Sequence, residues 1–298
     1  MNLIECVTRW INARELNRAP STISGYRRLT RKYIATSPIR EMEVCTIGEN
    51  DLIDLVKPLI LKGYTRQAQL LQVLVSAALK DAVRRREIGY NPMEYVEKVK
   101  HEARPTAWLS GDQAAQLLDS SARNRDPFFI AWLLMMCCGL RRGEMLALRW
   151  DDIDWQRQLL NIQRQQITID RETIITRPKS RKSIRSIPLD DHVITLLRLH
   201  QRENGPILEG VSAKALHDGL DRALIAAGVP RVTLHGLRHT MAATAAGEGI
   251  AIKILQGLMG HAHYQTTADI YAHVDQEPRR KAAAAIAARL LGTRLEIA

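Results

Sequence analysis

The chain has 298 residues, enough for two domains that each bury a core. Hydrophobic residues make up 46% of the sequence and charged residues 25%, which excludes an intrinsically disordered chain. Lys and Arg outnumber Asp and Glu by 43 to 32, a net charge of +11 that favours a polyanionic partner such as nucleic acid. A basic globular enzyme without such a partner would have the same balance, so charge alone leaves both interpretations open.

The sequence gives no support for membrane insertion or secretion. Its most apolar run, residues 128–140, is shorter than the roughly 20 residues that a spanning helix needs. Glu5 and Arg9 interrupt any apolar region of an N-terminal signal peptide. The four cysteines lack metal-ligand spacing, and the adjacent Cys137 and Cys138 are expected to be small core residues. We therefore expect a reduced, cytoplasmic protein.

Residues 1–103 are predicted to be a small domain of helices only. Apolar residues recur at helical spacing along this segment, between start signals such as Pro20-Ser21 and a stop at Gly89–Pro92. Four helices are expected: over 3–14, from an N-cap at Ser21, over 51–61 behind an Asn50 cap, and over 65–86. Two of them carry clusters of basic residues, which are candidate DNA contacts: Arg27, Arg28, Arg31, Lys32, Arg84, Arg85 and Arg86. The cluster at 84–86 has a second interpretation as a solvated helix end.

Residues 97–106 are charged, contain Pro105 and resemble a linker, so a second domain is expected over 104–298. Ser110 and Gln113 form a capping box at its first helix. An apolar helix over 128–138 follows, then one small antiparallel sheet and further helices, the last over 279–291. The expected strands are 159–163, 166–170, 173–176 and 185–188, with a basic loop at 179–182. The predicted fold class is mainly α with a small antiparallel β-sheet (α+β).

Several residues of the second domain have types suited to phosphate chemistry. Arg141 and Glu144 lie three residues apart beside the apolar helix, where unpaired charges would be costly. His235 and Arg238 have the same spacing and share one face of a predicted helix. Arginines grip phosphate oxygens with paired donors, and histidines move protons. The hydroxyl of Tyr271 would be a nucleophile once phosphate-bound cations lower its pKa.

Five short motifs occur in one order along this domain: GLRRGE at 139–144, Lys179 in the basic loop, HGLRH at 235–239, GH at 260–261 and YAH at 271–273. Their order and spacing across residues 105–275 resemble the tyrosine recombinase (phage integrase) family. Residues 1–103 resemble, less specifically, the family's core-site-binding domain, and no further arm-binding domain is evident. Two departures, Cys138 where Thr is common and Met259 where Leu is common, carry no chemistry.

The resemblance implies a role for each phosphate-binding residue. Arg141 and Arg238 would hold the non-bridging oxygens of the scissile phosphate and stabilise the pentacoordinate transition state. His261 would add a further donor to the phosphate. Glu144 would orient the cluster without touching the substrate.

The resemblance also implies how protons and bonds move. Tyr271 would attack the phosphate and form a 3′-phosphotyrosyl bond, with His235 managing the tyrosine's proton. Lys179 would be the general acid on the leaving 5′ oxygen, although Lys182 in the same loop is a second candidate. Because the phosphotyrosyl bond conserves the energy of the phosphodiester, neither a metal, ATP nor any other cofactor is expected.

The implied partner is double-stranded DNA at specific recombination sites, for integration or excision of a phage or other mobile element. A homo-tetramer is expected on synapsed DNA, with a monomer free in solution, possible help from DNA-bending or directionality proteins, and a nucleoid-associated location. The apolar face of helix 279–291 would dock on a neighbouring protomer, or else pack on its own domain. Salt should weaken DNA binding steeply, because phosphate contacts dominate affinity.

Three other functions compete with recombination. A type IB topoisomerase shares the same chemistry but needs no tetramer. A non-catalytic DNA-binding regulator would be favoured if Tyr271 or an arginine were inert. A metal-dependent hydrolase is suggested by the spacing of His235 and His239, but Arg238 between them would repel a cation, and no acidic motif completes a ligand set.

Overall fold

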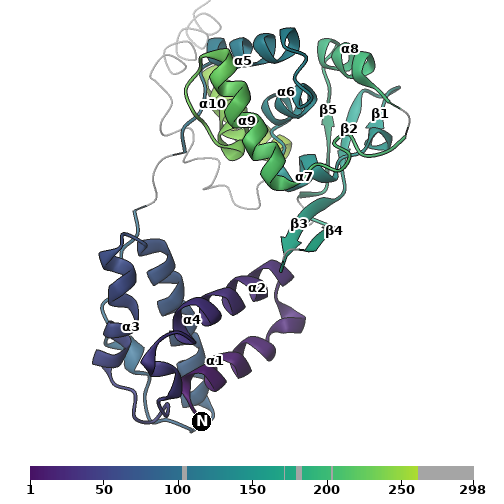
Figure 1. Cartoon of the computed structure of the whole chain (residues 1–298). Helices are drawn as coiled ribbons and strands as arrows, with labels where there is room; N and C mark the ends of the chain where they lie inside the picture. Colours follow the sequence, from purple (N-terminus) through teal and green to yellow (C-terminus); the bar gives the residue numbers. More distant parts are fainter. Residues whose placement is uncertain (103–105, 171, 179–182, 203, 261–298) are drawn as a thin grey trace, which may run out of the picture. The chain divides into compact units, whose positions relative to one another are not determined.

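The computed structural model describes residues 1–102, 106–170, 172–178, 183–202 and 204–260 (Figure 1). The described residues divide into two compact units, which we call unit 1 (1–102, with a short stretch around 168–172) and unit 2 (the rest). Each unit has its own hydrophobic core. Within these ranges, no helix combines the length and the apolarity that a membrane crossing requires.

Unit 1 is helical, as the periodicity predicts. Its elements are α1 (Leu3–Asn12), α2 (Pro20–Leu29) with a π-helical extension (Thr30–Ile34), α3 (Glu49–Leu61), α4 (Thr65–Arg84) and short 3-10 turns at Glu15–Asn17, Pro38–Glu41 and Pro92–Glu94. The stripe Ala68, Leu71, Leu74, Val75, Ala78, Leu79 and Ala82 makes α4 the centre of the core. Apolar burial along this stripe therefore holds the unit together.

Two helix starts differ from the sequence prediction. Helix α2 begins at Pro20, with Ala19 as N-cap, so Ser21 is not the cap. Proline suits the first helical position because its fixed φ matches a helix and its missing N–H needs no partner there. Helix α3 begins behind Gly48, whose N–H donates to the Asp51 carboxylate at 2.9 Å, so Asn50 is not the cap either.

Unit 2 is built around an apolar helix. Its helices are α5 (Gly111–Arg123), α6 (Phe129–Cys137), α7 (Arg142–Ala147), α8 (Asp191–His200), α9 (Ala213–Ala227), α10 (Leu234–Gly247) and α11 (Ile252–Met259). Figure 1 shows α6 with α5 and α10 on one side and the strands β2 and β5 on the other. The predicted capping box is present, since Ser110 and Gln113 exchange hydrogen bonds at the start of α5.

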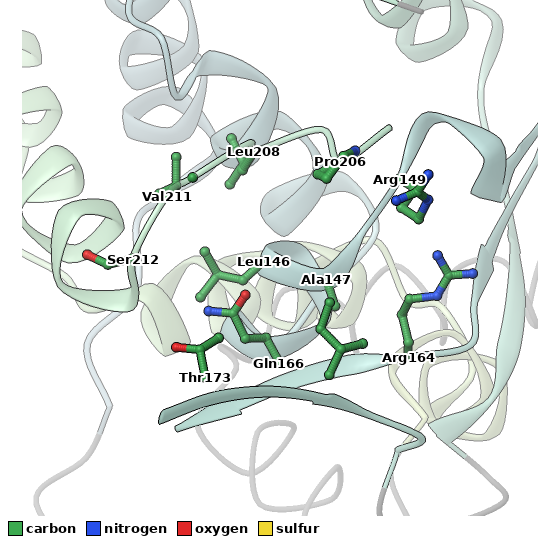
Figure 2. Close-up of a pocket in the computed structure, with 12 residues that line it drawn as sticks. Leu146, Ala147, Arg149, Arg164, Gln166, Thr173, Pro206, Leu208, Val211 and Ser212 are labelled. Atoms are coloured by element: carbon green, nitrogen blue, oxygen red, sulfur yellow. The ribbon is translucent and has the colours of Figure 1, made fainter. Parts of the chain in front are cut away.

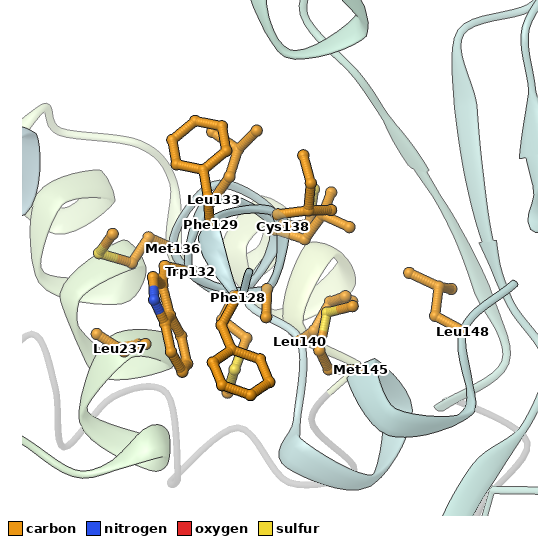
Figure 3. Close-up of a cluster of buried hydrophobic side chains, with 14 of the residues drawn as sticks. Phe128, Phe129, Trp132, Leu133, Met136, Cys138, Leu140, Met145, Leu148 and Leu237 are labelled. Atoms are coloured by element: carbon orange, nitrogen blue, oxygen red, sulfur yellow. The ribbon is translucent and has the colours of Figure 1, made fainter. Parts of the chain in front are cut away.

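Helix α6 is buried on nearly every side. Figure 3 views it almost end-on: Trp132 and Met136 extend toward Leu237 of α10, and Phe129 and Leu133 extend to another side. The expectation that both adjacent cysteines lie in the core is wrong for Cys137, which is exposed at the last residue of α6. Cys138 is buried, and burial raises the pKa of its thiol.

The strands form two sheets, so the prediction of one sheet is wrong. Strands β1 (Ile153–Asp154), β2 (Leu159–Ile162) and β5 (Arg185–Pro188) make an antiparallel sheet in the order β1-β2-β5, with the buried Leu160 opposite the buried Ile187. Strands β3 (Gln165–Ile169) and β4 (Glu172–Thr176) pair separately. Side chains of β3 and β4 are half-buried or exposed, so this pair has no apolar face that would draw it onto the core sheet.

Candidate active site

Two glycines of the motifs end helices that lead into the site. Gly139 follows α6 with φ 60°, and Gly260 follows α11 with φ 62°; side chains rarely adopt this left-handed conformation. The last carbonyls of a helix have no partner within the helix and need donors from elsewhere. Here arginine side chains supply several of these donors.

Arg238 joins the ends of α6 and α11. It lies on α10, which starts at Thr233, whose hydroxyl accepts the N–H of Gly236 at 3.0 Å. The Arg238 side chain is fully buried; its Nη1 donates to Gly139 O at 2.5 Å and its Nη2 to Met259 O at 2.6 Å. Among the described residues its Nε has no acceptor. Arg238 therefore places a buried cation, whose Nε–H has no acceptor among the described residues, between the ends of α6 and α11.

Arg141 and Glu144 form the ion pair that their spacing suggests. Arg141 is the N-cap of α7, and both its N–H (2.9 Å) and its Nη1 (2.7 Å) donate to the Glu144 carboxylate. Its Nη2 donates to Gly260 O at 2.9 Å. About a third of the Arg141 side chain stays exposed (33%), whereas Glu144 is 1% exposed. Arg141 is thus the guanidinium of this cluster that reaches solvent.

A third arginine, Arg185 at the start of β5, contacts the same carboxylate. Its Nη1 and Nη2 donate to Glu144 at 3.2 and 3.0 Å. Burial acts to raise the pKa of Glu144, but the hydrogen bonds and charges of Arg185 and Arg141 outweigh it and lower the pKa overall. Glu144 is therefore ionised at neutral pH, and the three guanidiniums of the cluster exceed it by two positive charges. Arg185 is not among the residues singled out from the sequence; the available signal was a basic residue at the start of the predicted strand 185–188.

Burial and neighbouring cations also set the charge of the other members. Burial lowers the pKa of Arg238 to about 9, with Arg141 adding repulsion, so Arg238 stays charged at neutral pH. His235 and His239 lie on the same helix with ring centroids 4.7 Å apart. Desolvation by the surrounding protein lowers the pKa of His235 to about 4, and His239, Arg238 and Arg141 contribute, although the residue as a whole is exposed. His235 is therefore neutral at physiological pH, the form that can accept a proton, although the nearby positive charge makes it a weak base.

Acid should destabilise unit 2 through His235. Its pKa is about 4 in the folded protein against an ordinary 6.5, so the unfolded chain binds the proton first as pH falls. The corresponding stability is complete above pH 6.5 and is lost between pH 6.5 and 4. We expect the thermal unfolding midpoint to fall more steeply over this range in the wild type than in His235→Asn. Identical slopes for the two proteins would show that His235 titrates normally.

Four of the residues singled out in the sequence lie outside the described residues: Lys179, Lys182, His261 and Tyr271. The predicted helix over 279–291 lies outside them as well. The structure brings together Arg141, Glu144, Arg238 and His235, which come from two of the five motifs. A third motif, GH at 260–261, contributes its glycine carbonyl to Arg141.

Unit 2 also contains a cavity of about 640 Å³ between α7, the β3–β4 pair and the segment before α9 (Figure 2). Leu146, Leu208 and Val211 line it together with Gln166 and Arg164. None of the site residues described above lines this cavity. The cationic cluster is thus separate from this cavity.

The candidate DNA contacts of unit 1 have different surroundings, and Arg31 is exposed on the π-helical extension of α2. Arg28 and Lys32 line a hollow of about 610 Å³ together with Arg66, Tyr26 and Tyr33. The basic side chains there lie beside aromatic rings, which suits a nucleic-acid surface.

Ion pairs occupy three of the other predicted contacts, Arg27, Arg84 and Arg85. Arg27 pairs with Glu15 at 2.9 Å. Arg84 and Arg85 both pair with the buried Asp81, and the hydrogen bond from Arg85 lowers the pKa of that carboxyl. Arg86 follows the end of α4 in the left-handed conformation, with φ 61°. Arg84 and Arg85 therefore stabilise the end of α4 through Asp81. This arrangement is close to the alternative interpretation of residues 84–86 as a solvated helix end.

Comparison with known proteins identifies the family. Residues 107–277 match the phage integrase family. A tyrosine recombinase XerC-like protein of Caldanaerobacter subterraneus subsp. tengcongensis is 27% identical over 87% of this chain and 75% of the relative. The ICEBs1 integrase of Bacillus subtilis is 19% identical over 87% of this chain and 76% of the relative.

Solved structures share the fold over nearly the whole chain. The Tn1549 transposon integrase in complex with circular intermediate DNA matches with a TM-score of 0.78 at 19% identity, covering 95% of this chain and 99% of that one. A lambda integrase tetramer bound to a Holliday junction matches with a TM-score of 0.70 at 17% identity, covering 93% and 78%. The predicted fold class and resemblance are confirmed: the chain belongs to the phage integrase family of tyrosine recombinases, which break and rejoin DNA.

Proposed function

We propose that this protein is a site-specific recombinase that cuts and rejoins DNA through a 3′-phosphotyrosyl intermediate and a four-way junction, for integration or excision of a mobile element. The observation that carries the proposal is the cluster of Arg141, Arg185 and Arg238 around one buried carboxylate, Glu144. Its excess positive charge suits the oxygens of a phosphodiester, whose charge grows in the pentacoordinate transition state.

The site residues divide the work of one transesterification. Arg141, Arg238 and His261 bind the non-bridging oxygens, and Glu144 holds Arg141 in place. His235, neutral at physiological pH, takes the proton of Tyr271 as its oxygen attacks phosphorus. The bond from phosphorus to the 5′ oxygen breaks, and Lys179 protonates that oxygen. The reverse reaction, with a 5′ hydroxyl of another strand as nucleophile, reseals the DNA.

The partner in this proposal is double-stranded DNA gripped by two domains, 1–103 and 104–298. Arg28 and Lys32 of the first domain lie in the basic and aromatic hollow, which supports their role in DNA contact. The chain acts as a homo-tetramer on synapsed DNA and as a monomer free in solution. One observation supports the tetramer: a matched solved structure is a lambda integrase tetramer bound to a Holliday junction.

Covalent capture tests this function and identifies the DNA target in the same experiment. The protein is expressed in a bacterial host, and DNA that stays attached after denaturation is purified and sequenced. We expect enrichment of one short sequence, joined at a 3′ phosphate to the peptide that contains Tyr271. The purified protein should form the same adduct on a synthetic duplex of that sequence in EDTA and without ATP.

The products then distinguish recombination from strand relaxation. Two labelled duplexes that contain the captured sequence should exchange partners and pass through a four-way junction. Supercoil relaxation on DNA of any sequence, without exchange, would instead indicate a type IB topoisomerase. Specific binding with no covalent adduct would indicate a DNA-binding regulator.

A further inference from the structure

We infer that Arg185 is a positioning residue for the DNA cleavage step, an inference that rests on the proposed function. Its role is to neutralise Glu144 and to lock the end of α11, so that Arg141 keeps both its charge and its place for the scissile phosphate. Arg185 lies outside the five motifs and touches none of the reacting groups assigned above.

The first support is a set of three consecutive carbonyls at the end of α11. Leu258 O accepts from Arg185 Nε at 2.7 Å. Met259 O accepts from Arg238, and Gly260 O accepts from Arg141 at 2.9 Å. Each arginine comes from a different element, β5, α10 and the start of α7 respectively. One helix terminus therefore sets the relative positions of all three guanidiniums, and Arg185 is the one that attaches this terminus to the core sheet.

The second support is the charge on Glu144. This carboxylate is 1% exposed, so it must be compensated by neighbouring cations. If Arg141 were the sole partner of Glu144, the pair would be neutral, and no net positive charge would remain for the phosphate. Arg185, itself 7% exposed, supplies the second cation and binds both carboxylate oxygens. Glu144, Arg141 and Arg185 together then keep a net positive charge. Arg141, whose side chain is 33% exposed, is the member of this group that faces solvent.

The third support is the place of Arg185 in the chain. It follows the basic loop 179–182, and its Nη1 also donates to Ser183 O at 3.1 Å. Its side chain thereby ties the backbone directly after that loop to Glu144. A residue that only stabilised the fold would not need to connect α7, α11 and the backbone at Ser183.

The matched control is Arg164, which pairs with the buried Asp152 at 3.1 Å in the same unit. Among the described residues, no hydrogen bond or ion pair joins Arg164 to the cluster. Arg164→Met therefore removes an arginine from a buried carboxylate, as Arg185→Met does, without disturbing Glu144. It reports what the loss of such an ion pair does to cleavage through stability alone.

The experiment measures single-turnover cleavage of a duplex with the captured sequence, nicked so that the cut end diffuses away and the adduct accumulates. DNA affinity and thermal unfolding are measured for each variant. We expect Arg185→Met to slow cleavage about 10- to 100-fold, the range known for outer partners that orient reacting groups. DNA affinity should change little, because phosphate contacts elsewhere dominate it. Arg185→Lys, which keeps the charge, should lie between Arg185→Met and the wild type.

The decisive variant is the double substitution Arg185→Met with Glu144→Gln. Removing the uncompensated carboxylate should release Arg141, so the double variant should cleave faster than Arg185→Met. If Arg185→Met fails to fold, the same comparison is made with Arg185→Gln, which also removes the charge but keeps a polar side chain.

Three results would overturn the inference alone: wild-type cleavage by Arg185→Met, a double variant no faster than its parent, or an equal loss of cleavage in Arg164→Met. A wild-type protein that forms no adduct would instead overturn the proposed function, and the inference with it.

Discussion

Tyr271→Phe should abolish the covalent protein–DNA adduct while leaving the fold and DNA affinity intact. The substitution removes the hydroxyl proposed to attack phosphorus and keeps the aromatic ring and its packing. The measurement is the yield of adduct on the captured sequence, resolved by denaturing electrophoresis, beside DNA affinity of the intact protein. An adduct formed by Tyr271→Phe would refute the assignment of the nucleophile.

A substrate with sulfur in place of the 5′-bridging oxygen separates the nucleophile from the general acid. If Lys179 protonates the leaving oxygen, Lys179→Ala should slow cleavage roughly 10²- to 10⁴-fold, the usual effect of losing a positioned proton donor. A thiolate leaves without protonation, so the sulfur substrate should restore cleavage to Lys179→Ala and not to Tyr271→Phe. Rescue of Lys182→Ala but not of Lys179→Ala would assign the acid to Lys182.

Arg238→Lys should slow cleavage about 10²- to 10³-fold, the usual effect of removing one preorganised donor to a developing negative charge. Lysine keeps the charge but cannot reproduce the guanidinium fork that reaches both Gly139 O and Met259 O. One or both of these buried carbonyls then loses its donor, which also lowers the free energy of unfolding. Cleavage rate and thermal unfolding are measured together.

Arg231→Lys provides the matched control for this substitution. Arg231 also binds two acceptors, both oxygens of Asp221 at 3.0 and 2.7 Å, but on the surface and away from the cluster. Its replacement by lysine should leave cleavage and stability near wild type, because exposed ion pairs contribute little. A similar loss of cleavage in both variants would mean that Arg238 has no special place in the reaction.

The sequence by itself determined the helical plan, because local signals decide it. Apolar residues at helical spacing identify α4, a continuous apolar run identifies α6, and the pair Ser110 and Gln113 identifies the start of α5. Arg141 and Glu144 are three residues apart, about one helical turn, so their contact follows from local geometry. The order of the five motifs was sufficient to recognise the family, since each motif needs its residue types for phosphate chemistry.

The tertiary structure alone decided which distant groups meet. Arg185 lies 41 residues from Glu144 and 73 from Leu258, and no local pattern predicts contacts over such separations. The same holds for Cys137 and Cys138, where the end of α6 exposes one of two identical neighbours. For Asp81 the contacts with Arg84 and Arg85 are local, about one helical turn away, and tertiary packing decided only that this carboxylate is buried. For the distant contacts, burial of a charge or an apolar surface selects the partner, and burial is a property of the folded chain as a whole.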